Sequence, residues 1–456
     1  MDFYYELTTK FDKPFINLMG VQGINHGLWT VAVLAAQDLF KQYIKLDPGE
    51  MTLCMSIIHL PWSFKILYGL LSDNVPIAGS RRRSYIIIMG LIQFFSLIVI
   101  SMIHEKVSVV VALLALTSMA EAFMNVVVDA MLCKQARKDP EHGSQDLISF
   151  SWMATGVGGI MGCVIGGVMT QYFHPRYSFL LYSIFGMISA VNGMQLTKES
   201  ESDQVELNES QDSLASQQPE GFYAKLRLNI SQIISAIKMP EIYLVILYFV
   251  FSGLTSPDFS DFSYYFMLNV IKLSKFQYSM LGLIGSFTGV LGTIYFEKYL
   301  KDIEVRTLIY YATICSVVQS CSSYAFACRL NLYLGINDVV FIICTDTVFG
   351  VMSLALFTLP IMALFAKITP HNIEGTVFAF LTGTVNMSNT ILSPMIGVYL
   401  NNKFVGVTAT DLSGYKNLCF FGIISSFIGF LLLPLIPLKD DIAKWQSLRQ
   451  EAPEKV

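Results

Sequence analysis

The sequence predicts an all-α membrane protein of twelve transmembrane helices in two six-helix bundles, and three observations carry this prediction. Of the 456 residues, 54% are hydrophobic and only 14% are charged, whereas a soluble domain has about 25% charged residues. Twelve apolar runs are long enough to cross a bilayer. Between the sixth and the seventh run, residues 198–220 are polar and acidic without periodicity, which is typical of a disordered linker.

The apolar runs fall into two sets of six. They lie at roughly 17–40, 48–72, 84–103, 107–133, 146–171 and 177–197, and then at 241–270, 276–298, 305–328, 335–367, 371–400 and 414–438. The predicted domains are an N-terminal bundle over 1–197, a cytoplasmic linker over 198–238, and a C-terminal bundle with its tail over 239–456. Within the linker, residues 221–238 alternate basic and aliphatic residues at helical spacing, which indicates an amphipathic helix on the membrane surface.

A weak internal repeat supports two related halves. Ile44-Lys45-Leu46 ends the first run and Ile271-Lys272-Leu273 ends the seventh, while Asp129 late in the fourth run corresponds to Asp346 in the tenth. Transporters built from duplicated bundles show weak symmetry of this kind.

Charge bias predicts the orientation in the membrane. With both termini in the cytoplasm, 20 of the 30 Lys and Arg residues fall in inside segments and nine in outside loops. Positive charge is enriched on the cytoplasmic side of membrane proteins, so this orientation is expected. We expect a monomer in the lipid bilayer, with the plasma membrane favoured over an organelle membrane. The net charge of −4 gives no reason to expect nucleic acid.

The reactive residues do not group into a catalytic pattern. The eight cysteines are scattered, mostly in apolar runs, without a CxxC or Cys/His cluster. No P-loop, hydrolase triad or metalloenzyme helix is present in the sequence. We therefore expect no metal, no cofactor and no enzymatic activity, and any solute accumulation must use an ion gradient or exchange.

Lys65 is the most informative single residue because it lies inside an apolar run. Ionisable residues in the membrane are costly and are candidate functional sites. The fourth run carries a polar stripe in which Glu121, Asn125 and Asp129 recur every fourth residue. Glu121 lies at a depth close to that of Lys65, so a Lys65–Glu121 ion pair is plausible. The pair is either part of a substrate site or a structural lock between the second and fourth helices.

The seventh run suggests a broken helix. Pro257 lies between apolar segments beside Asp258 and Asp261, and Tyr265 follows. Such a break is tolerated where it lines a cavity; exposure at the outer mouth, with the aromatic residues in an interfacial belt, explains these residues equally well. The predicted substrate-binding residues are Lys65, Glu121, Asp258, Asp261, Tyr265, Asp346 and Asn386, with Asp346 and Glu121 as candidates for proton coupling.

Two further patterns have structural interpretations. Charged residues near the cytoplasmic ends of the helices predict a network that holds a gate: Asp73, Arg81, Arg82, Arg83, Asp129, Arg137 and Glu374. The fifth run carries Gly158, Gly162 and Gly166 at GxxxGxxxG spacing, which predicts close helix packing and no ligand contact.

Several motifs resemble those of known transporters. Gly69-Leu70-Leu71-Ser72-Asp73 followed by arginines resembles the loop motif between helices two and three of the major facilitator superfamily. The longer stretch PWSFKILYGLLSDNVPIAGSRRRSY (61–85) is similar to the folate–biopterin transporter family. Three more stretches agree with that family: NVVVDAMLCKQAR (125–137), SWMATGVGGIMGCVIGG (151–167) and PHNIEGTVFAFLTGTVNMSN (370–389).

The resemblance implies the major facilitator fold and proton-linked import of folates, pterins or related compounds. The residues that match the family pattern are Lys65, Asp73, Arg81, Asp129 and Glu374. Asn74 replaces a common basic residue, Asn125 stands where the family often has aspartate, and Lys134 where glutamate is common. We therefore expect a secondary transporter of a small organic solute, and the alternative is a non-transporting subunit or sensor that keeps the fold.

Overall fold

The structure is a computed structural model, and it describes residues 2–103, 105–136, 138–139, 143–196, 222–369 and 374–451. The described residues are helical almost throughout and form no β-strand, apart from an isolated bridge between Ile77 and Ser80. The predicted all-α class is confirmed. The part of the linker at 198–220 lies outside the described residues.

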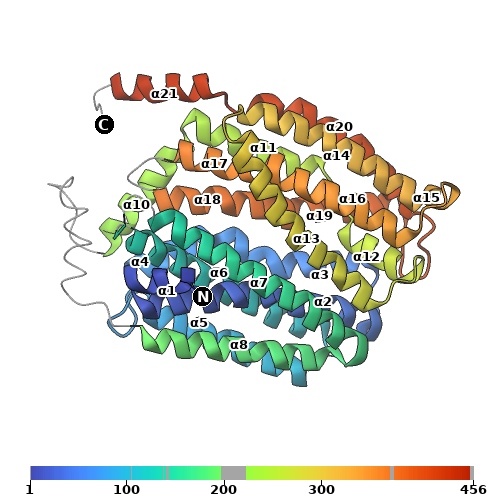
Figure 1. The fold of residues 1–456 in the computed structure, drawn as a ribbon, viewed down its shortest axis with the longest axis horizontal. Coiled ribbons are helices and arrows are strands. Elements are labelled where there is room, and N and C mark those ends of the chain that lie inside the picture. The colour runs from blue at the N-terminus through green and yellow to red at the C-terminus, as the bar shows by residue number, and fades with distance from the viewer. Residues whose placement is uncertain are drawn as a thin grey trace. The chain divides into compact units, whose positions relative to one another are not determined.

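The first eight α-helices follow in chain order from the N-terminus (Figure 1). They are α1 (Asp2–Lys10), α2 (Lys13–Asp38), α3 (Pro48–His59), α4 (Lys65–Asn74), α5 (Arg83–Met102), α6 (Val107–Ala136), α7 (Gly143–Tyr172) and α8 (Pro175–Gln195). A π-helical turn, Leu39–Ile44, extends α2, and a 3-10 turn, Leu60–Phe64, joins α3 to α4.

The remaining helices begin at Phe222, and the first of them, α10, coincides with the amphipathic helix expected over 221–238 of the linker. They are α10 (Phe222–Ile237), α11 (Pro240–Thr255), α12 (Ser260–Asn269), α13 (Lys275–Tyr295), α14 (Val305–Ala327), α15 (Leu330–Tyr333), α16 (Asp338–Ser353), α17 (Leu359–Ile368), α18 (Glu374–Met387), α19 (Ser393–Leu400), α20 (Tyr415–Leu432) and α21 (Lys439–Glu451). Four more π-helical turns occur at Phe296–Leu300, Leu354–Thr358, Ser388–Leu392 and Asn401–Val405, and a second 3-10 turn at Leu433–Leu435.

The helices coincide with the apolar runs of the sequence. Among the described residues, eight helical segments are long and apolar enough to cross a membrane: Pro48–Ser72, Arg83–Met102, Val107–Ala136, Asp146–Tyr172, Pro175–Gln195, Pro240–Asn269, Asp338–Phe365 and Tyr415–Leu448. The other four predicted runs are helical too, in α2, α13, α14 and the segment of α18 and α19. The chain is therefore an integral, multi-pass membrane protein.

The chain divides into two compact units. Unit 1 comprises Met1–Ala35, Phe64–Met169 and Phe173–Ser235, and unit 2 comprises Ala36–Ser63, Thr170–Tyr172 and Ala236–Val456. These units group segments that contact each other, and they do not follow the order of the chain. Residues 36–63, for example, belong to unit 2 although they precede the linker. The predicted domain boundaries at 197 and 239 therefore stay a prediction.

Helix α7 shows how unit 1 meets both lipid and protein. Val157, Met161, Val164 and Val168 recur at helical spacing and are exposed, as expected of a face in contact with lipid. On another face, a Cβ atom added at Gly158 would collide with the carbonyl oxygen of Ile24 in α2. The backbones of α2 and α7 therefore touch, and the predicted packing role of the glycines agrees with this geometry.

Unit 2 contains the predicted helix break. Helix α11 ends at Thr255 and α12 begins at Ser260, so the interruption includes Pro257 and Asp258. Proline lacks a backbone N–H and cannot continue the helical hydrogen bonds. The freed backbone is paired with another helix, since Asp258 N donates to the carbonyl oxygen of Ser393 at the start of α19, at 3.1 Å. In this unit α21 lies at one end and α15 at the opposite end (Figure 1).

The sequence repeat at Lys45 and Lys272 has a shared backbone geometry. Both lysines are left-handed, with φ of 63° and 61°. In each case the next residue closes the helix end: Leu46 N donates to Phe40 O at 2.9 Å, and Leu273 N donates to Met267 O at 3.0 Å. Each of the two hydrogen bonds joins residues six apart in the sequence and follows a left-handed lysine. Corresponding helix ends in the two sequence halves therefore terminate alike.

Candidate functional site

The interior of unit 1 contains a polar cluster around Glu121. Its carboxylate is 1% exposed. It accepts hydrogen bonds from Gln22 Nε2 at 3.1 Å, from Asn25 Nδ2 at 2.5 Å and from the Tyr182 hydroxyl at 3.0 Å. Buried charge is tolerated only where hydrogen bonds replace water. We call Glu121 with Gln22, Asn25 and Tyr182 the Glu121 cluster.

A second layer of hydrogen bonds fixes the donors of the Glu121 cluster. The amides of Asn25 and Gln93 exchange two hydrogen bonds, each 3.1 Å long. The residues come from α2, α5, α6 and α8, so the cluster ties four helices of unit 1 together. Sequence reasoning found Glu121 but missed its partners. Amide side chains such as Gln22 and Gln93 inside apolar runs were the available signal, since polar groups in a membrane segment seek partners.

The expected Lys65–Glu121 ion pair is not formed. Lys65 Nζ instead donates to Asn125 Oδ1 at 2.7 Å. Asn125 lies one turn beyond Glu121 on α6, and the 3-10 turn Leu60–Phe64 resets the helix just before Lys65. The pairing prediction was wrong because two side chains at a similar depth in the membrane meet only if their helices are rotated to turn them toward each other. Asp129, a further turn along α6, attracts Lys65 electrostatically and has an exposed side chain.

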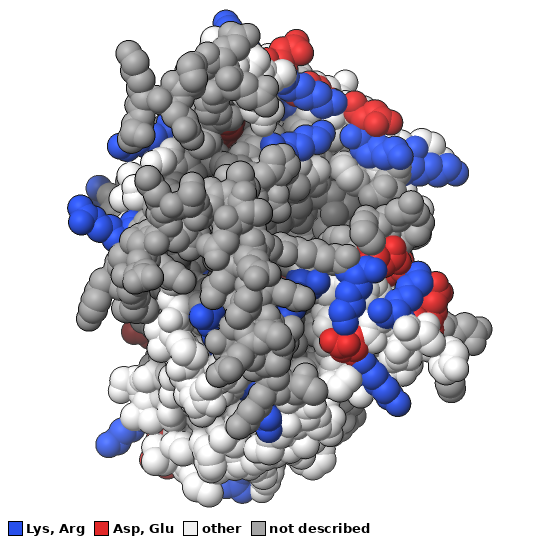
Figure 2. All heavy atoms as spheres, turned by 90° about the vertical axis from the view of Figure 1, so that its left-hand side faces the viewer, with Lys and Arg blue, Asp and Glu red and all other residues white. Residues whose placement is uncertain are grey.

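The predicted gate residues are described only in part. The side chains of Asp73 and Glu374, like the whole of Arg137, lie outside the described part of the chain. Arg81, Arg82 and Arg83 are half-buried, and the backbone N–H groups of Arg82 and Arg83 donate to Ser80 Oγ at 3.4 and 3.1 Å. The gate stays a prediction. Lysines and arginines lie among acidic residues on the face shown in Figure 2.

In unit 2 the residues around the helix break have firm partners. Asp258 Oδ1 accepts a hydrogen bond from Ser260 N at 3.0 Å, a local turn contact just before α12. Asp261 is 8% exposed and accepts from Gln37 Nε2 at 3.2 Å. The Tyr265 hydroxyl donates to Leu46 O at 2.5 Å, and its side chain is 1% exposed. The suggested interfacial belt does not apply here, because the ring of Tyr265 is packed inside the unit.

The other predicted residues of unit 2 divide into two cases. Asn386 Nδ2 donates to the Trp62 carbonyl oxygen at 3.2 Å, so it joins α18 to the 3-10 turn that follows α3. This matches the interhelical role that polar residues often have in membrane helices. The side chain of Asp346 lies outside what the structure describes, and its predicted role is neither supported nor opposed.

The structure adds an ion pair that sequence reasoning missed. Asp38, the last residue of α2, is 0% exposed, and its Oδ1 lies 2.5 Å from Nζ of Lys275 at the start of α13. A lysine near a predicted loop gives no local sign of such a partner. An acid inside the first apolar run was a usable signal, because intramembrane carboxylates are rarely without function.

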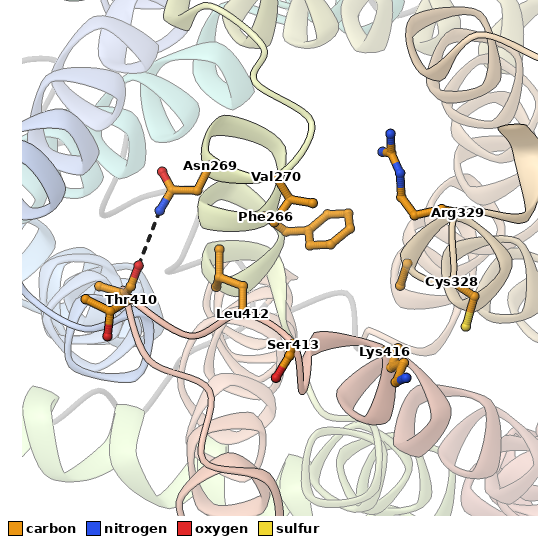
Figure 3. Close-up of a pocket in the computed structure, with 11 residues that line it drawn as sticks. Phe266, Asn269, Val270, Cys328, Arg329, Thr410, Leu412, Ser413 and Lys416 are labelled. Atoms are coloured by element: carbon orange, nitrogen blue, oxygen red, sulfur yellow. Dashed lines mark hydrogen bonds between the residues drawn. The ribbon is translucent and has the colours of Figure 1, made fainter.

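Two pockets open in unit 2, and Asn269 and Thr410 line both of them. One, of about 480 Å³, is lined by Arg329 and Lys416 on one side and by Asn269 and Thr410 on the other, with Phe266 between them (Figure 3). The second, of about 630 Å³, shares Asn269 and Thr410 and is lined by Lys41, Lys45 and Tyr265. Both volumes are in the range of small-molecule sites. Cationic side chains on their walls would favour anions.

Comparison with known proteins points to one family. A family model described as the BT1 family matches residues 22–455. The chain is 25% identical to a folate-biopterin transporter of Synechocystis over 94% of this chain and 83% of the relative. It is also 25% identical to a probable chloroplastic folate-biopterin transporter 8 of Arabidopsis thaliana, over 89% of this chain and 72% of the relative.

Solved structures confirm the fold. A mutant form of the nucleoside transporter NupG superposes with a TM-score of 0.69 at 11% identity, over 92% of this chain and all of that one. Such a low identity carries the fold alone. The chain therefore has the all-helical fold of these solved transporters, in agreement with the fold that the sequence motifs implied.

Proposed function

Because the chain belongs to the BT1 family of transporters and is not an enzyme, we propose that it moves a folate, a biopterin or a related organic solute across a membrane by alternating access. Proton coupling is part of the proposal. The observation that carries it is the position of Lys65, whose ammonium lies in a membrane-spanning segment against the neutral amide of Asn125. Glu121 is enclosed by its own donors, so Asp129 and not Glu121 is the carboxylate of α6 that acts on this ammonium.

The chemistry of a folate suits these groups. Its carboxylates would pair with the Lys65 ammonium, and its flat pterin would stack on aromatic rings. We propose Lys65, Asp258, Asp261, Tyr265, Asp346 and Asn386 as substrate-binding residues, and Glu121 and Asp346 as proton-coupling residues. In the same proposal both termini face the cytoplasm, the protein acts as a monomer in the plasma membrane, and the two predicted bundles move about the substrate.

The test is uptake by proteoliposomes that contain only this protein. Radiolabelled folate and biopterin are supplied with and without an imposed pH gradient, and uptake is compared with that of empty liposomes. We expect accumulation of at least one solute, driven by the gradient. If neither solute enters, the transporter proposal fails and the alternative of a non-transporting subunit or sensor is favoured.

Variants of Lys65 test the observation on which the proposal rests. Lys65→Ala removes a charge-assisted contact worth about 1.5–3 kcal/mol, which corresponds to roughly a 10- to 100-fold loss of apparent affinity. Lys65→Arg keeps the charge with a different shape and should retain weak uptake. Lys106→Ala, at an exposed lysine, is the matched control and should transport normally. Uptake by Lys65→Ala equal to that of the control would remove Lys65 from the site.

A further inference from the structure

One end of unit 2 is closed by a set of polar contacts between residues 37–47 and the helices that follow the linker. We call these contacts the polar layer. They are Gln37 to Asp261 at 3.2 Å, Asp38 to Lys275 at 2.5 Å, Lys41 to Asn269 at 2.7 Å, the Tyr265 hydroxyl to Leu46 O at 2.5 Å, and Ala409 N to Asp47 Oδ1 at 2.7 Å. Of these, the Asp38–Lys275 contact alone joins two opposite charges.

The two partners of this ion pair differ in their access to water. The Asp38 side chain is 0% exposed, whereas that of Lys275 is 26% exposed. A lysine with a long apolar stem can turn its ammonium toward water when its partner is lost. A short, fully buried aspartate cannot, so it must either keep the lysine or take up a proton.

Among the groups around Asp38, Lys275 is the one that chiefly stabilises its negative charge. Lys275 on α13 and Lys41 in the π-helical turn are the cations that act on its carboxylate, and Lys41 is held by Asn269. The tyrosines near it are Tyr43 in the same turn and Tyr264 on α12. Among the described donors, none places a hydrogen bond of ordinary angle on either oxygen of Asp38. The carboxylate is thus stabilised by charge attraction, which a single proton removes.

We propose that the Asp38–Lys275 ion pair is a proton-operated latch, and that protonation of Asp38 releases the polar layer. The proton comes from water and binds a carboxylate oxygen of Asp38. Lys275 keeps its own proton and turns to water, so the ion pair is the interaction lost. This inference rests on the proposed function, because it gives proton coupling a further residue beside Glu121 and Asp346 and a conformational consequence.

Hydrogen exchange measures the latch without any substrate. The full-length protein in lipid nanodiscs is labelled over a range of pH from about 5 to about 8, and amide exchange in residues 36–47 and 264–276 is corrected for the intrinsic effect of pH. In the wild type we expect corrected exchange in both segments to increase as the pH falls. In Asp38→Asn, which resembles the protonated acid, we expect exchange about tenfold faster or more at the alkaline end of this range, with no further pH dependence.

The control is a second ion pair of the same unit. Arg329 and Asp338 lie 2.9 Å apart but are partly exposed, so Asp338→Asn should keep the pH dependence of the wild type. Lys275→Gln should open the layer as Asp38→Asn does, and the swap Asp38→Lys with Lys275→Asp should restore protection. If Asp38→Asn exchanges like the wild type and like Asp338→Asn, or if wild-type exchange does not depend on pH, the latch is wrong.

The two proposals fail in different experiments. Absence of uptake in proteoliposomes contradicts the transporter function, whatever the exchange data show. Unchanged exchange in Asp38→Asn contradicts the latch, even in a protein that transports normally. A transporter whose pH-driven uptake survives Asp38→Asn intact likewise contradicts the latch.

Discussion

Glu121 in unit 1 and Asp38 in unit 2 are both fully buried carboxylates, but they are stabilised in opposite ways. Glu121 accepts hydrogen bonds from two amides and a tyrosine hydroxyl. Asp38 faces a lysine at 2.5 Å and receives no hydrogen bond of ordinary angle from the described donors. The first environment is made of neutral dipoles on several helices, and the second is made of one opposite charge.

The difference indicates which group is suited to change state. Neutral donors that are themselves tied together, as Asn25 is to Gln93, cannot leave without stranding other buried groups. A lysine that reaches water can leave alone. We infer that the donors around Glu121 keep their places in the unit 1 core whether or not the carboxyl binds a proton, while the Asp38–Lys275 pair forms and breaks.

The largest effect is expected from removing the acceptor of the Glu121 cluster. Glu121→Leu removes the shared acceptor of three buried donors: Asn25 keeps Gln93 Oε1 and the Tyr182 hydroxyl keeps the Asn25 carbonyl oxygen, but Gln22 Nε2 loses the acceptor described for it. Each buried unsatisfied group costs about 1–3 kcal/mol, so the free energy of unfolding should fall by roughly 3 kcal/mol or more. The loss is measured by heating the purified protein in detergent and determining the fraction that stays folded by size-exclusion chromatography.

Glu121→Gln is the matched control for that substitution. It keeps the shape and one acceptor oxygen but places an NH₂ group among donors, so it should be less destabilising than Glu121→Leu. If Glu121→Leu is as stable as the wild type, the cluster is not the permanent support that the comparison requires.

A smaller effect is expected when both partners of the Asp38–Lys275 pair are replaced. Breaking a buried pair from one side typically costs about 3–5 kcal/mol, whereas replacing both partners with apolar residues is often neutral. Here the exposure of Lys275 reduces the cost of losing Asp38. We expect Asp38→Leu alone to be destabilising, and Asp38→Leu with Lys275→Met to recover most of that loss.

A double-mutant cycle in the unfolding assay measures this recovery. The control cycle uses Arg329 and Asp338, whose partly exposed pair should show a coupling energy of about 1 kcal/mol or less. If the losses of unfolding free energy from the two single substitutions add up in the double variant, Asp38 and Lys275 do not stabilise each other. That result would contradict the view that Asp38, unlike Glu121, depends on one opposite charge.

Much of the fold followed from the sequence, because hydropathy and helical period are local properties. The twelve helical runs, the break at Pro257 and the close packing of the α7 glycines were all predictable on that basis, although α2 as the partner of the glycines was not. The family resemblance also followed from contiguous motifs, and the match over residues 22–455 confirms it.

The partners within the candidate sites were less predictable. The position of Lys65 inside a run was visible, but its contact with Asn125 depends on the rotation of α4 after a 3-10 turn. Asp38 and Lys275 are far apart in the sequence, and no periodic pattern relates the two. Side-chain pairing between helices requires their relative rotation and offset, which a single sequence does not contain.

The smallest effect on stability is expected from replacing Asp12, which lies outside the predicted membrane spans. Its carboxylate has both a neutral amide partner, as Glu121 has, and a lysine partner, as Asp38 has. It accepts from Gln135 Nε2 at 2.5 Å and lies 2.9 Å from Lys138 Nζ at the end of α6. Partial burial acts to raise the pKa of Asp12, but the contacts with Lys138 and Gln135 outweigh it and hold that pKa below its usual value. The charged form is therefore favoured in the folded protein.

The sign of the pH effect follows from that lowered pKa. The stabilisation by Asp12 is fully present above the pKa of about 3.9 that aspartate has in the unfolded chain, and it is lost as the pH falls through the lower folded pKa. Because the side chain is 57% exposed, water and salt screen the contact, and its contribution is about 1 kcal/mol or less.

Asp12→Asn should thus lower the unfolding temperature slightly and equally from about pH 5 to about pH 8, with the difference from wild type shrinking below about pH 4. Thermal unfolding across this pH range, beside Glu121→Leu, measures both effects. If Asp12→Asn destabilised the protein as much as Glu121→Leu does, burial would not determine how much a carboxylate contributes to the stability of this protein.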